Sequence, residues 1–368
     1  MRKPRTIAYD ILCDVYLNGQ FANLALKQSL QSVPDQDKNL ISALVYTTIR
    51  HQIAARAQWI DLVEVNAVLR KVVERGQKEL TGNDEIATQA LNLSIPLWIY
   101  KLWVKQFGQD KAYKIASSMN EEGQLTARIN TLKVDPNEIY ADERVNKGSL
   151  SPLAIRSSAA LLNSEWFKEG KIVIQDESSQ LVSVFTGVKA NDRVLDLCSA
   201  PGSKATAMAA MMNNTGSILA CDLYASRLEL VEQQAQRLGV TNLTTLCVDG
   251  RLIGSQNLKQ FDVILVDAPC SGLGVLRHKP DIKVHLKPET LDELTVLQKE
   301  LLDAVAPMTK ISGNLIYSTC TLNRKENELQ VLRFLEDHPN YVLVEERLIL
   351  PYETDSDGFY MAKLRRLK

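Results

Sequence analysis

The second half of the chain alternates short apolar runs with segments of helical periodicity, and this alternation restricts the possible folds most strongly. From about residue 170 the apolar runs are KIVIQD, RVLDLCSAPG, SILACDL, TTLCVDG, FDVILVDAPCSG and NLIYSTCTLN. Segments such as ASRLELVEQQAQRLG and ETLDELTVLQKELLDAVAPM separate them. Strands that alternate with helices form a parallel sheet whose faces the helices cover. We therefore predict an α/β, Rossmann-like domain over residues 171–368.

The last two apolar segments of the chain differ from the others. No helical pattern separates YVLVEERLIL from DGFYMAKLRR. Because a parallel connection needs a long crossover, strands joined without one pair in antiparallel. We expect these two strands to complete the sheet as an antiparallel pair.

The first 60 residues show helical periodicity instead. Ile7, Ile11 and Val15 recur at every fourth position, and a second helical pattern contains Leu40, Leu44, Ile49 and Ile53. This spacing is typical of one face of an amphipathic helix. The segment carries a small excess of basic residues, which is compatible with RNA but is equally typical of a solvated face.

The rest of the first half divides into two parts. The polar, glycine-containing stretch at residues 75–85 predicts a loop. After a helical stretch rich in aromatic residues, LTARINTLKVDP at residues 125–136 predicts a strand and a turn. We therefore place an all-α domain at residues 1–90 and a small α+β domain at residues 91–170.

The overall composition restricts the class of protein only loosely. The chain has 368 residues, of which 45% are hydrophobic and 24% charged, as in ordinary globular proteins. A net charge of −1 gives no global support for nucleic-acid binding, so that case must rest on local features. No apolar run is long enough to span a bilayer, and MRKPRTIAYD lacks the apolar core of a signal peptide. We expect a cytoplasmic protein.

Each of the cysteines needs its own interpretation. None of them forms a CxxC or CxxH pair, so we predict no zinc or other metal site, and without an export signal we expect no disulfides. Cys13, Cys221 and Cys247 lie within apolar patterns and are predicted to be core residues. Cys198 lies in a glycine-containing loop, where its backbone would contact a ligand.

Polar or reactive side chains follow five successive predicted strands. They are the segment Asp196–Lys204, Asp222, Asp249, the segment Asp267–Cys270 and the segment Ser318–Cys320. Ligands in open α/β sheets bind beyond the carboxyl ends of the strands. We therefore predict that one edge of the sheet carries the functional site.

The first of these loops, LDLCSAPGSK, indicates the kind of cofactor. It matches neither the GxGxxG of dinucleotide binders nor the phosphate-binding GxxxxGK[ST]. Gly202 would allow a ligand to approach the backbone closely. Asp222 stands where an acid binds ribose hydroxyls, and Asp249 suits an adenine or ribose contact. A cofactor with a nucleoside but no pyrophosphate fits best, and S-adenosylmethionine is such a cofactor.

Two of the loops contain cysteines at the tips of their strands. Cys270 lies in DAPCSGLG and Cys320 lies in YSTCTLN. The two strands are neighbours in the expected topology, so both thiols can face one pocket, because functional loops lie at strand tips. The alternative is that both cysteines are buried core residues.

Together, DLCSAPGSK, DAPCSG and STCTLNRKENE resemble the RNA cytosine-C5 methyltransferase family, and within it the bacterial Sun/Fmu-type enzymes of 16S ribosomal RNA. The resemblance covers nearly the whole chain. IPLWIYKLWVKQFG and LTARINTLK resemble the small middle domain of the family. RTIAYDIL, LVYTTIR and VNAVLRKVVERG resemble its NusB-like RNA-binding domain. DNA cytosine methyltransferases use the PC cysteine as nucleophile and lack the TC partner.

The resemblance implies an S-adenosylmethionine-dependent enzyme that methylates C5 of a cytosine in 16S ribosomal RNA through a covalent adduct at C6. Cys320 would be the nucleophile, and Cys270 would help to resolve the adduct. Lys204 and Asp267 would also lie near the target base. The chain would act as a monomer, without a membrane or a metal. The implied cofactor residues are Cys198, Ser199, Ala200, Pro201, Gly202, Ser203, Lys204, Asp222, Asp249 and Asp267.

The chain departs from the family pattern in two places. Ser203 replaces the second glycine of the usual PGGK loop, which is tolerable if its backbone keeps a negative φ. The NusB-like domain is shortened, because the long segment that normally precedes its last helix is mostly missing.

Other functions remain open on the same residues. A nicotinamide-dependent oxidoreductase would use the same sheet, but the absent GxGxxG argues against it. A non-catalytic NusB-like RNA-binding factor would not need the cysteine pair. A methyltransferase acting on tRNA or 23S ribosomal RNA would share all of these motifs.

Overall fold

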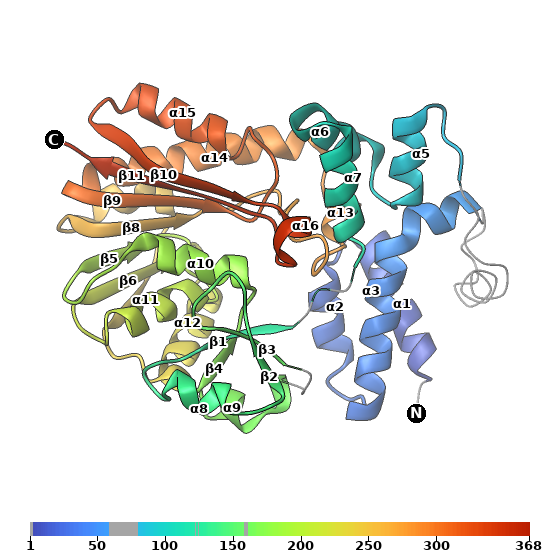
Figure 1. Cartoon of the computed structure of the whole chain (residues 1–368), viewed down its shortest axis with the longest axis horizontal. Helices are drawn as coiled ribbons and strands as arrows, with labels where there is room; N and C mark the ends of the chain where they lie inside the picture. The colour runs from blue at the N-terminus through green and yellow to red at the C-terminus, as the bar shows by residue number, and fades with distance from the viewer. Residues whose placement is uncertain (1–2, 59–79, 122, 124, 158–160) are drawn as a thin grey trace. The chain divides into compact units, whose positions relative to one another are not determined.

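A computed structural model describes residues 3–58, 80–121, 123, 125–157 and 161–368 (Figure 1). By their contacts these residues form two compact units. One consists of residues 1–122 with 275–288, and the other of residues 123–274 with 289–368. VNAVLRKVVERG and much of the predicted loop at residues 75–85 lie outside the described residues. None of the described helices is both long and apolar enough to cross a bilayer.

The first unit is helical, as the periodicity predicts. Its core comes from the first three helices and contains Ile11, Val15, Ile41, Val45 and Ile49. Its helices are α1 (Pro4–Leu17), α2 (Ala22–Ser29), α3 (Asp35–Gln58), α5 (Glu85–Asn92), α6 (Leu97–Phe107), α7 (Gln109–Ser118) and α13 (Ile282–His285).

The stripe predicted on α3 is confirmed in part. Ile49 is buried and Leu44 packs against the core, but Leu40 is 49% exposed. The core positions in the first half of α3 are Ile41 and Val45, which have the same spacing as Leu40 and Leu44, so periodicity alone does not choose between the two pairs.

Residues 275–288 reach the helical unit from a distant part of the sequence. Asp281 accepts a hydrogen bond from Ala22 N at 3.0 Å, at the start of α2. Lys283 is buried, and its Nζ donates to Arg50 O at 2.6 Å and Ser94 O at 2.8 Å. Val284 packs against the core of the unit. This segment is therefore a structural part of the helical unit.

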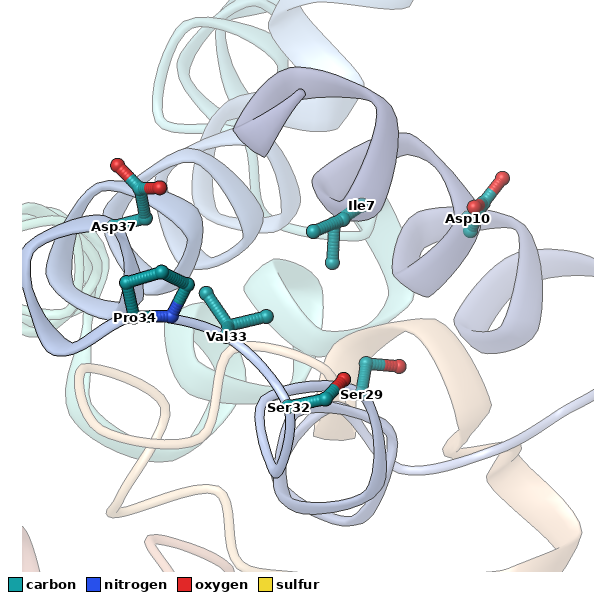
Figure 2. Close-up of a pocket in the computed structure, with 7 residues that line it drawn as sticks. All are labelled: Ile7, Asp10, Ser29, Ser32, Val33, Pro34 and Asp37. Atoms are coloured by element: carbon teal, nitrogen blue, oxygen red, sulfur yellow. The ribbon is translucent and has the colours of Figure 1, made fainter. Parts of the chain in front are cut away.

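A pocket of ≈ 340 Å³ lies within the helical unit, beside α1, α2 and the start of α3 (Figure 2). Its lining contains two carboxylates and no cation, so it does not suit a nucleic-acid phosphate. The lining residues are Ile7, Asp10, Ser29, Ser32, Val33, Pro34 and Asp37.

The second unit contains a small antiparallel sheet in the order β2-β3-β1-β4. Its strands are β1 (Thr126–Ile129), β2 (Val145–Lys147), β3 (Ala154–Ser157) and β4 (Ile172–Ile174), with α8 (Pro136–Tyr140) and α9 (Glu165–Lys168). The placement of KIVIQD with the parallel runs was wrong, because β4 pairs in antiparallel with β1. A short apolar run does not reveal which sheet will pair with it.

The large sheet has the order β10-β11-β9-β8-β5-β6-β7 (Figure 1). Strands β5 to β9 are parallel to one another, and β10 and β11 form the predicted antiparallel pair beside β9. The strands are β5 (Arg193–Asp196), β6 (Ser217–Asp222), β7 (Leu243–Cys247), β8 (Phe261–Asp267), β9 (Thr309–Thr319), β10 (Tyr341–Ile349) and β11 (Phe359–Arg366). The predicted Rossmann-like architecture is confirmed.

Helices pack along the large sheet and bury its central strands. The core contains Leu195, Ile264, Val266, Leu315 and Tyr317, all of which are fully buried. The helices of this unit include α10 (Glu177–Thr186), α11 (Ser203–Met211), α12 (Ala225–Leu238), α14 (Pro288–Val305) and α15 (Glu328–Asp337), with the single turn α16 (Pro351–Thr354) between β10 and β11.

The cysteines predicted to lie in cores differ in their outcomes. Cys221 is buried as predicted, and Cys13 is half-buried. The prediction for Cys247 was wrong, because its side chain is exposed. Cys247 ends β7, which is an edge strand of the large sheet. An edge strand lacks a neighbour on one side and leaves such positions open to solvent.

Candidate functional site

The tips of β8 and β9 bring the two candidate catalytic cysteines together. The strands are parallel neighbours, with Asp267 opposite Ser318. Just beyond these tips, the Sγ atoms of Cys270 and Cys320 lie 3.4 Å apart, and both side chains are half-buried. The structure therefore brings together the two thiols that the sequence analysis placed at the tips of neighbouring strands. The separation exceeds the ~2.05 Å of a disulfide, so the sulfur atoms are not covalently joined.

A close approach of two backbones holds this arrangement. Gly274 N donates to Cys320 O at 3.0 Å, and Gly358 N donates to Gly274 O at 2.8 Å. A Cβ atom at position 274 would lie 2.0 Å from Gly358 O and 2.8 Å from Cys320 O. Only glycine fits there, so the glycine that follows the DAPCSG motif allows the two cysteine loops to meet.

An ion pair between a buried lysine and a half-buried aspartate lies at the same strand tips. Lys204 Nζ, from α11, contacts Asp267 Oδ2 at 2.6 Å, and Ser318 Oγ donates to Asp267 Oδ1 at 2.7 Å. Burial by itself lowers the pKa of Lys204, but Asp267, with further contributions from Cys320 and Asp196, raises it above its usual value. Lys204 therefore stays charged at neutral pH and supplies a positive charge close to Cys320.

Cys270 has the opposite electrostatic environment. Its pKa is raised well above the usual value by the hydrogen bond with Cys320, by burial, and by the negative charges of Cys320 and Glu326, while a hydrogen bond from the backbone of Gly272 partly opposes the rise. Burial disfavours the charged form of a thiol. Cys270 is therefore a neutral thiol at neutral pH.

The loop before α11 has the shape of a ligand-binding turn. Gly202 caps the helix with φ 95°, in the left-handed region. A Cβ atom there would lie 3.0 Å from Val231 Cγ1, so glycine is required both for conformation and for space. Ser203 is the first residue of α11 and is not among the residues with positive φ. The substitution of the usual second glycine by serine therefore causes no backbone strain.

Asp196, at the end of β5, was noted as a strand-end acid but was given no role in the sequence analysis. It is 1% exposed, and among the described residues its carboxylate has at most the Ser199 side chain as a hydrogen-bond donor. Burial, with the negative charges of Asp267 and Asp222, raises its pKa to about 7, while Ser199 and Lys204 partly oppose the rise. A buried carboxylate with so few partners is costly, and such groups mark ligand sites. The sequence signal that could have identified Asp196 as a site residue is its position at the end of the first parallel strand.

This raised pKa predicts a pH-dependent stability. A carboxyl group whose pKa is higher in the folded state loses stability as pH rises from its unfolded pKa to the folded value. Asp196→Asn removes this loss. The stability of the variant relative to the wild type should therefore increase by roughly 2–3 kcal/mol between pH 5 and pH 8. Urea unfolding of both proteins at the two pH values measures the difference, and a constant difference would contradict the assignment.

The other two predicted cofactor acids lie at their strand ends, each with an arginine partner that sequence reasoning missed. Asp222 is buried and pairs with Arg227 at 3.0 Å, and Arg227 also donates to Ala200 O. Asp249 pairs with Arg251 at 2.6 Å, and the hydrogen bonds from this arginine lower its pKa. No local pattern in the sequence marks either arginine as a partner.

Cys198 lies in the loop between β5 and α11, where the sequence analysis placed it. Burial, reinforced by Asp196, Asp267 and Asp222, raises the pKa of its thiol. The thiol is therefore unreactive at neutral pH. This agrees with a loop residue that contributes packing and backbone contacts rather than chemistry.

Comparison with known proteins identifies the family. Residues 184–365 match the family described as 16S rRNA methyltransferase RsmB/F. A probable ribosomal RNA small subunit methyltransferase B of Bacillus subtilis is 31% identical and covers 98% of this chain and 98% of its own length. A protein with the same description from Synechocystis sp. is 29% identical over 100% of both chains. The alignment with the Bacillus relative has 439 positions against 368 residues here, so that relative contains residues without counterparts in this chain.

A solved structure agrees with these matches. The crystal structure of a methyltransferase homolog protein from Pyrococcus horikoshii is 26% identical to the chain. It covers 78% of this chain and 100% of its own, with a TM-score of 0.70. The resemblance drawn from the DLCSAPGSK, DAPCSG and STCTLN motifs is confirmed, and the chain belongs to the 16S rRNA methyltransferase RsmB/F family.

Proposed function

We propose that the chain methylates C5 of a cytosine in 16S ribosomal RNA, with S-adenosylmethionine as methyl donor and a covalent bond between Cys320 and C6. The observation that supports this proposal most strongly is the 3.4 Å separation of the Cys270 and Cys320 Sγ atoms. The charged Lys204, which pairs with Asp267, interacts with Cys320. The names of the relatives, ribosomal RNA small subunit methyltransferase B, support a substrate in the small ribosomal subunit.

The residues at the carboxyl ends of β5 and β6 fit S-adenosylmethionine. This cofactor carries two cationic groups, an ammonium and a sulfonium, and the buried carboxylate of Asp196, which has few partners in the structure, is suited to receive a cation. The loop at residues 198–204 would hold the cofactor with its backbone, and Asp222 and Asp249 would contact the nucleoside. When bound, the cofactor supplies the methyl group. Asp267, already paired with Lys204, would border both the cofactor and the base.

The cysteines divide the chemistry between them. Cytosine C5 is a poor nucleophile, and addition of the Cys320 sulfur to C6 turns C5 into an enamine-like carbon, which is covalent catalysis. Lys204 would favour the attacking thiolate by its charge. After methylation the C5–C6 double bond re-forms as the C5 proton is removed and the C6–S bond breaks. Cys270, a neutral thiol 3.4 Å away, would give its proton to the departing sulfur and take up the C5 proton in exchange, so that both thiols end neutral.

A mapping experiment tests the proposal and its alternatives together. RNA from a strain that lacks the gene, and from the same strain complemented with it, is treated with bisulfite, which spares 5-methylcytosine. We expect one cytosine of 16S ribosomal RNA to lose its protection in the deletion strain. Loss of protection only in tRNA or 23S ribosomal RNA would identify the alternative substrate. No change in any RNA would reject the methyltransferase assignment for cytosine C5.

The cofactor assignment predicts the effect of Asp222→Ala. Loss of a charge-assisted hydrogen bond to the ribose should weaken S-adenosylmethionine binding by roughly 1.5–3 kcal/mol, or about 10- to 150-fold. Asp262→Ala is the matched control, because Asp262 also pairs with a cation but lies at the start of β8, the opposite edge of the sheet. Calorimetry should show unchanged affinity for the control. Unchanged affinity for Asp222→Ala, or tight NAD binding by the wild type, would reject the assignment.

We further propose that the helical unit adds RNA affinity. The hairpin of α6 and α7 has four exposed lysines and one acid, Asp110. Such a local cluster suits the RNA backbone although the whole chain is nearly neutral. The lysines are Lys101, Lys105, Lys111 and Lys114.

Substitution of three of these lysines tests this surface without deleting helices. In Lys101→Ala/Lys105→Ala/Lys111→Ala the slope of log affinity against log salt should become shallower by about 0.7 for each lost phosphate contact. S-adenosylmethionine binding should not change. Lys189→Ala/Lys259→Ala provides a control, because both lysines are exposed. They precede β5 and β8, so within the large sheet they lie at the amino ends of the strands, opposite the candidate site. An equal slope in the triple variant and the wild type would show that the hairpin does not contact RNA.

A further inference from the structure

Glu326 is a buried acid whose hydrogen bonds join the segments around the cysteine pair. It lies in the loop after Cys320 and is fully buried. Its carboxylate receives four hydrogen bonds, from Ser271 N at 2.9 Å, Ser271 Oγ at 2.5 Å, Gln298 Nε2 at 3.0 Å and Asn323 Nδ2 at 2.9 Å. These donors belong to the Cys270 loop, to α14 and to the Cys320 loop. A carboxylate is suited to this position because it only accepts hydrogen bonds.

Two further bonds connect this network to the residues beside the thiols. Gln298 Nε2 also donates to Pro269 O at 2.9 Å, directly before Cys270. Ser271 Oγ lies 2.7 Å from Thr321 Oγ1, which links the residues that follow the two cysteines. Glu326 therefore acts on the geometry of both loops at once. Apart from Gln298 Oε1, which has no hydrogen-bond partner among the described residues, these side chains are bonded to one another, and such networks restrict the motion of the segments that they join.

The same carboxylate contributes to the charge around Cys270. The titratable groups that interact with this thiol are Cys320, Glu326 and the buried phenol of Tyr317, and the backbone of Gly272 donates a hydrogen bond to it. Of these groups, Glu326 and Cys320 raise the pKa of Cys270, and Gly272 lowers it. Lys204, in contrast, interacts with Cys320. Of the two neighbouring thiols, Cys270 therefore interacts with the negative charge of Glu326, and Cys320 interacts with the positive charge of Lys204.

We propose that Glu326 is a positioning residue that clamps the two cysteine loops together and so holds the Cys270 thiol against the Cys320 sulfur. The clamp sets the sulfur–sulfur contact, and the negative charge disfavours a thiolate at position 270. This inference deepens the proposed function, on which its catalytic meaning rests. The effect on the thiols does not require RNA or cofactor, so it can be measured separately.

The decisive experiment is alkylation of the free protein by iodoacetamide across a series of pH values, with mass spectrometry to resolve the individual cysteines. In Glu326→Gln the midpoint for Cys270 should fall, because a negative charge beside the thiol is removed, so alkylation below the midpoint should be faster than in the wild type. Ser271→Ala loosens the clamp but keeps the charge. It should raise the Cys270 rate at every pH without moving the midpoint.

A matched control separates these effects from the loss of any buried acid. Glu177 is also fully buried and accepts hydrogen bonds from Arg156 Nε at 2.8 Å and Leu150 N at 2.8 Å. Glu177→Gln should cost stability and leave the Cys270 midpoint unchanged. If Glu326→Gln does not fold, Glu326→Asp, which withdraws the charge by one methylene, should lower the midpoint by a smaller amount. An unchanged midpoint in the folded Glu326 variant overturns the proposal.

Adduct assays then distinguish this inference from the proposed function. With RNA and S-adenosylmethionine, Glu326→Gln should accumulate a denaturant-resistant protein–RNA complex, as Cys270→Ala should, because the loosened clamp moves the Cys270 proton away from the departing sulfur. A shifted midpoint without an adduct in any variant would leave the inference intact and reject the covalent mechanism. An adduct in Cys270→Ala, with neither a shifted midpoint nor an adduct in Glu326→Gln, would reject the inference alone.

Discussion

Cys320→Ala is expected to abolish methylation and to leave the RNA without any covalent attachment to the protein. Without addition of a sulfur to C6, C5 of cytosine has no enamine character and does not attack the methyl donor. We expect a loss of roughly 10⁴-fold or more in rate, as for other enzymes that lose their nucleophile. Transfer of labelled methyl groups to 16S ribosomal RNA measures the rate, and denaturing electrophoresis detects the adduct.

The same experiment must show that the variant is folded and binds its cofactor. Calorimetry with S-adenosylmethionine provides this check, because the Cys320 thiol is not among the proposed cofactor contacts. Cys13→Ala is the matched cysteine control, since Cys13 is half-buried in α1 of the helical unit and should not affect turnover. Full activity of Cys320→Ala would remove this residue from the chemistry.

The position of the candidate site was predictable because parallel strands end at one edge. Each acid or thiol that follows a buried apolar run must lie at the carboxyl end of its strand. Five such runs therefore placed Asp196, Asp222, Asp249, Cys270 and Cys320 at the same edge without knowledge of the fold. The contact between the two thiols followed from strand order, because β8 and β9 are neighbours.

The features that sequence reasoning missed depend on contacts between distant segments. KIVIQD has the composition of a core strand, but its pairing with β1 is decided by the tertiary structure. Cys247 is exposed only because β7 lies at an edge. Residues 275–288 return to the helical unit through Asp281 and Lys283, whose partners are more than a hundred residues away. Local periodicity carries no information about such partners.

The sequence analysis also did not predict which charged residues shift the pKa values at the site. An isolated buried acid such as Glu326 looks like an ordinary polar loop residue until its four donors are seen together. Likewise, the pKa of Asp196 is raised to about 7 mainly by burial, and no sequence motif indicates how deeply a side chain is buried. The sequence therefore predicted which residue types meet at the site, whereas their protonation depends on the packing around them.

Cys270→Ala should separate methyl transfer from release of the RNA. The variant keeps Cys320 and Lys204, so the adduct can form and the methyl group can transfer. Cys270 lies 3.4 Å from the Cys320 sulfur and carries a proton that the departing sulfur needs. Without it, the methylated protein–RNA adduct should accumulate as a denaturant-resistant band, while turnover falls by roughly 10²- to 10⁴-fold, the usual contribution of general acid–base catalysis.

The rival assignment, taken from the DNA cytosine methyltransferases, makes Cys270 the attacking residue and predicts the reverse pattern. The Cys270→Ala adduct must contain the methyl label, because it would form after transfer, and a band without label would place the block before transfer. Cys270→Ala/Cys320→Ala should form no band, which excludes attachment through another residue. An adduct in Cys320→Ala and none in Cys270→Ala would exchange the roles of the two thiols. Their environments oppose that exchange, because the cation Lys204 interacts with Cys320 and the acid Glu326 with Cys270.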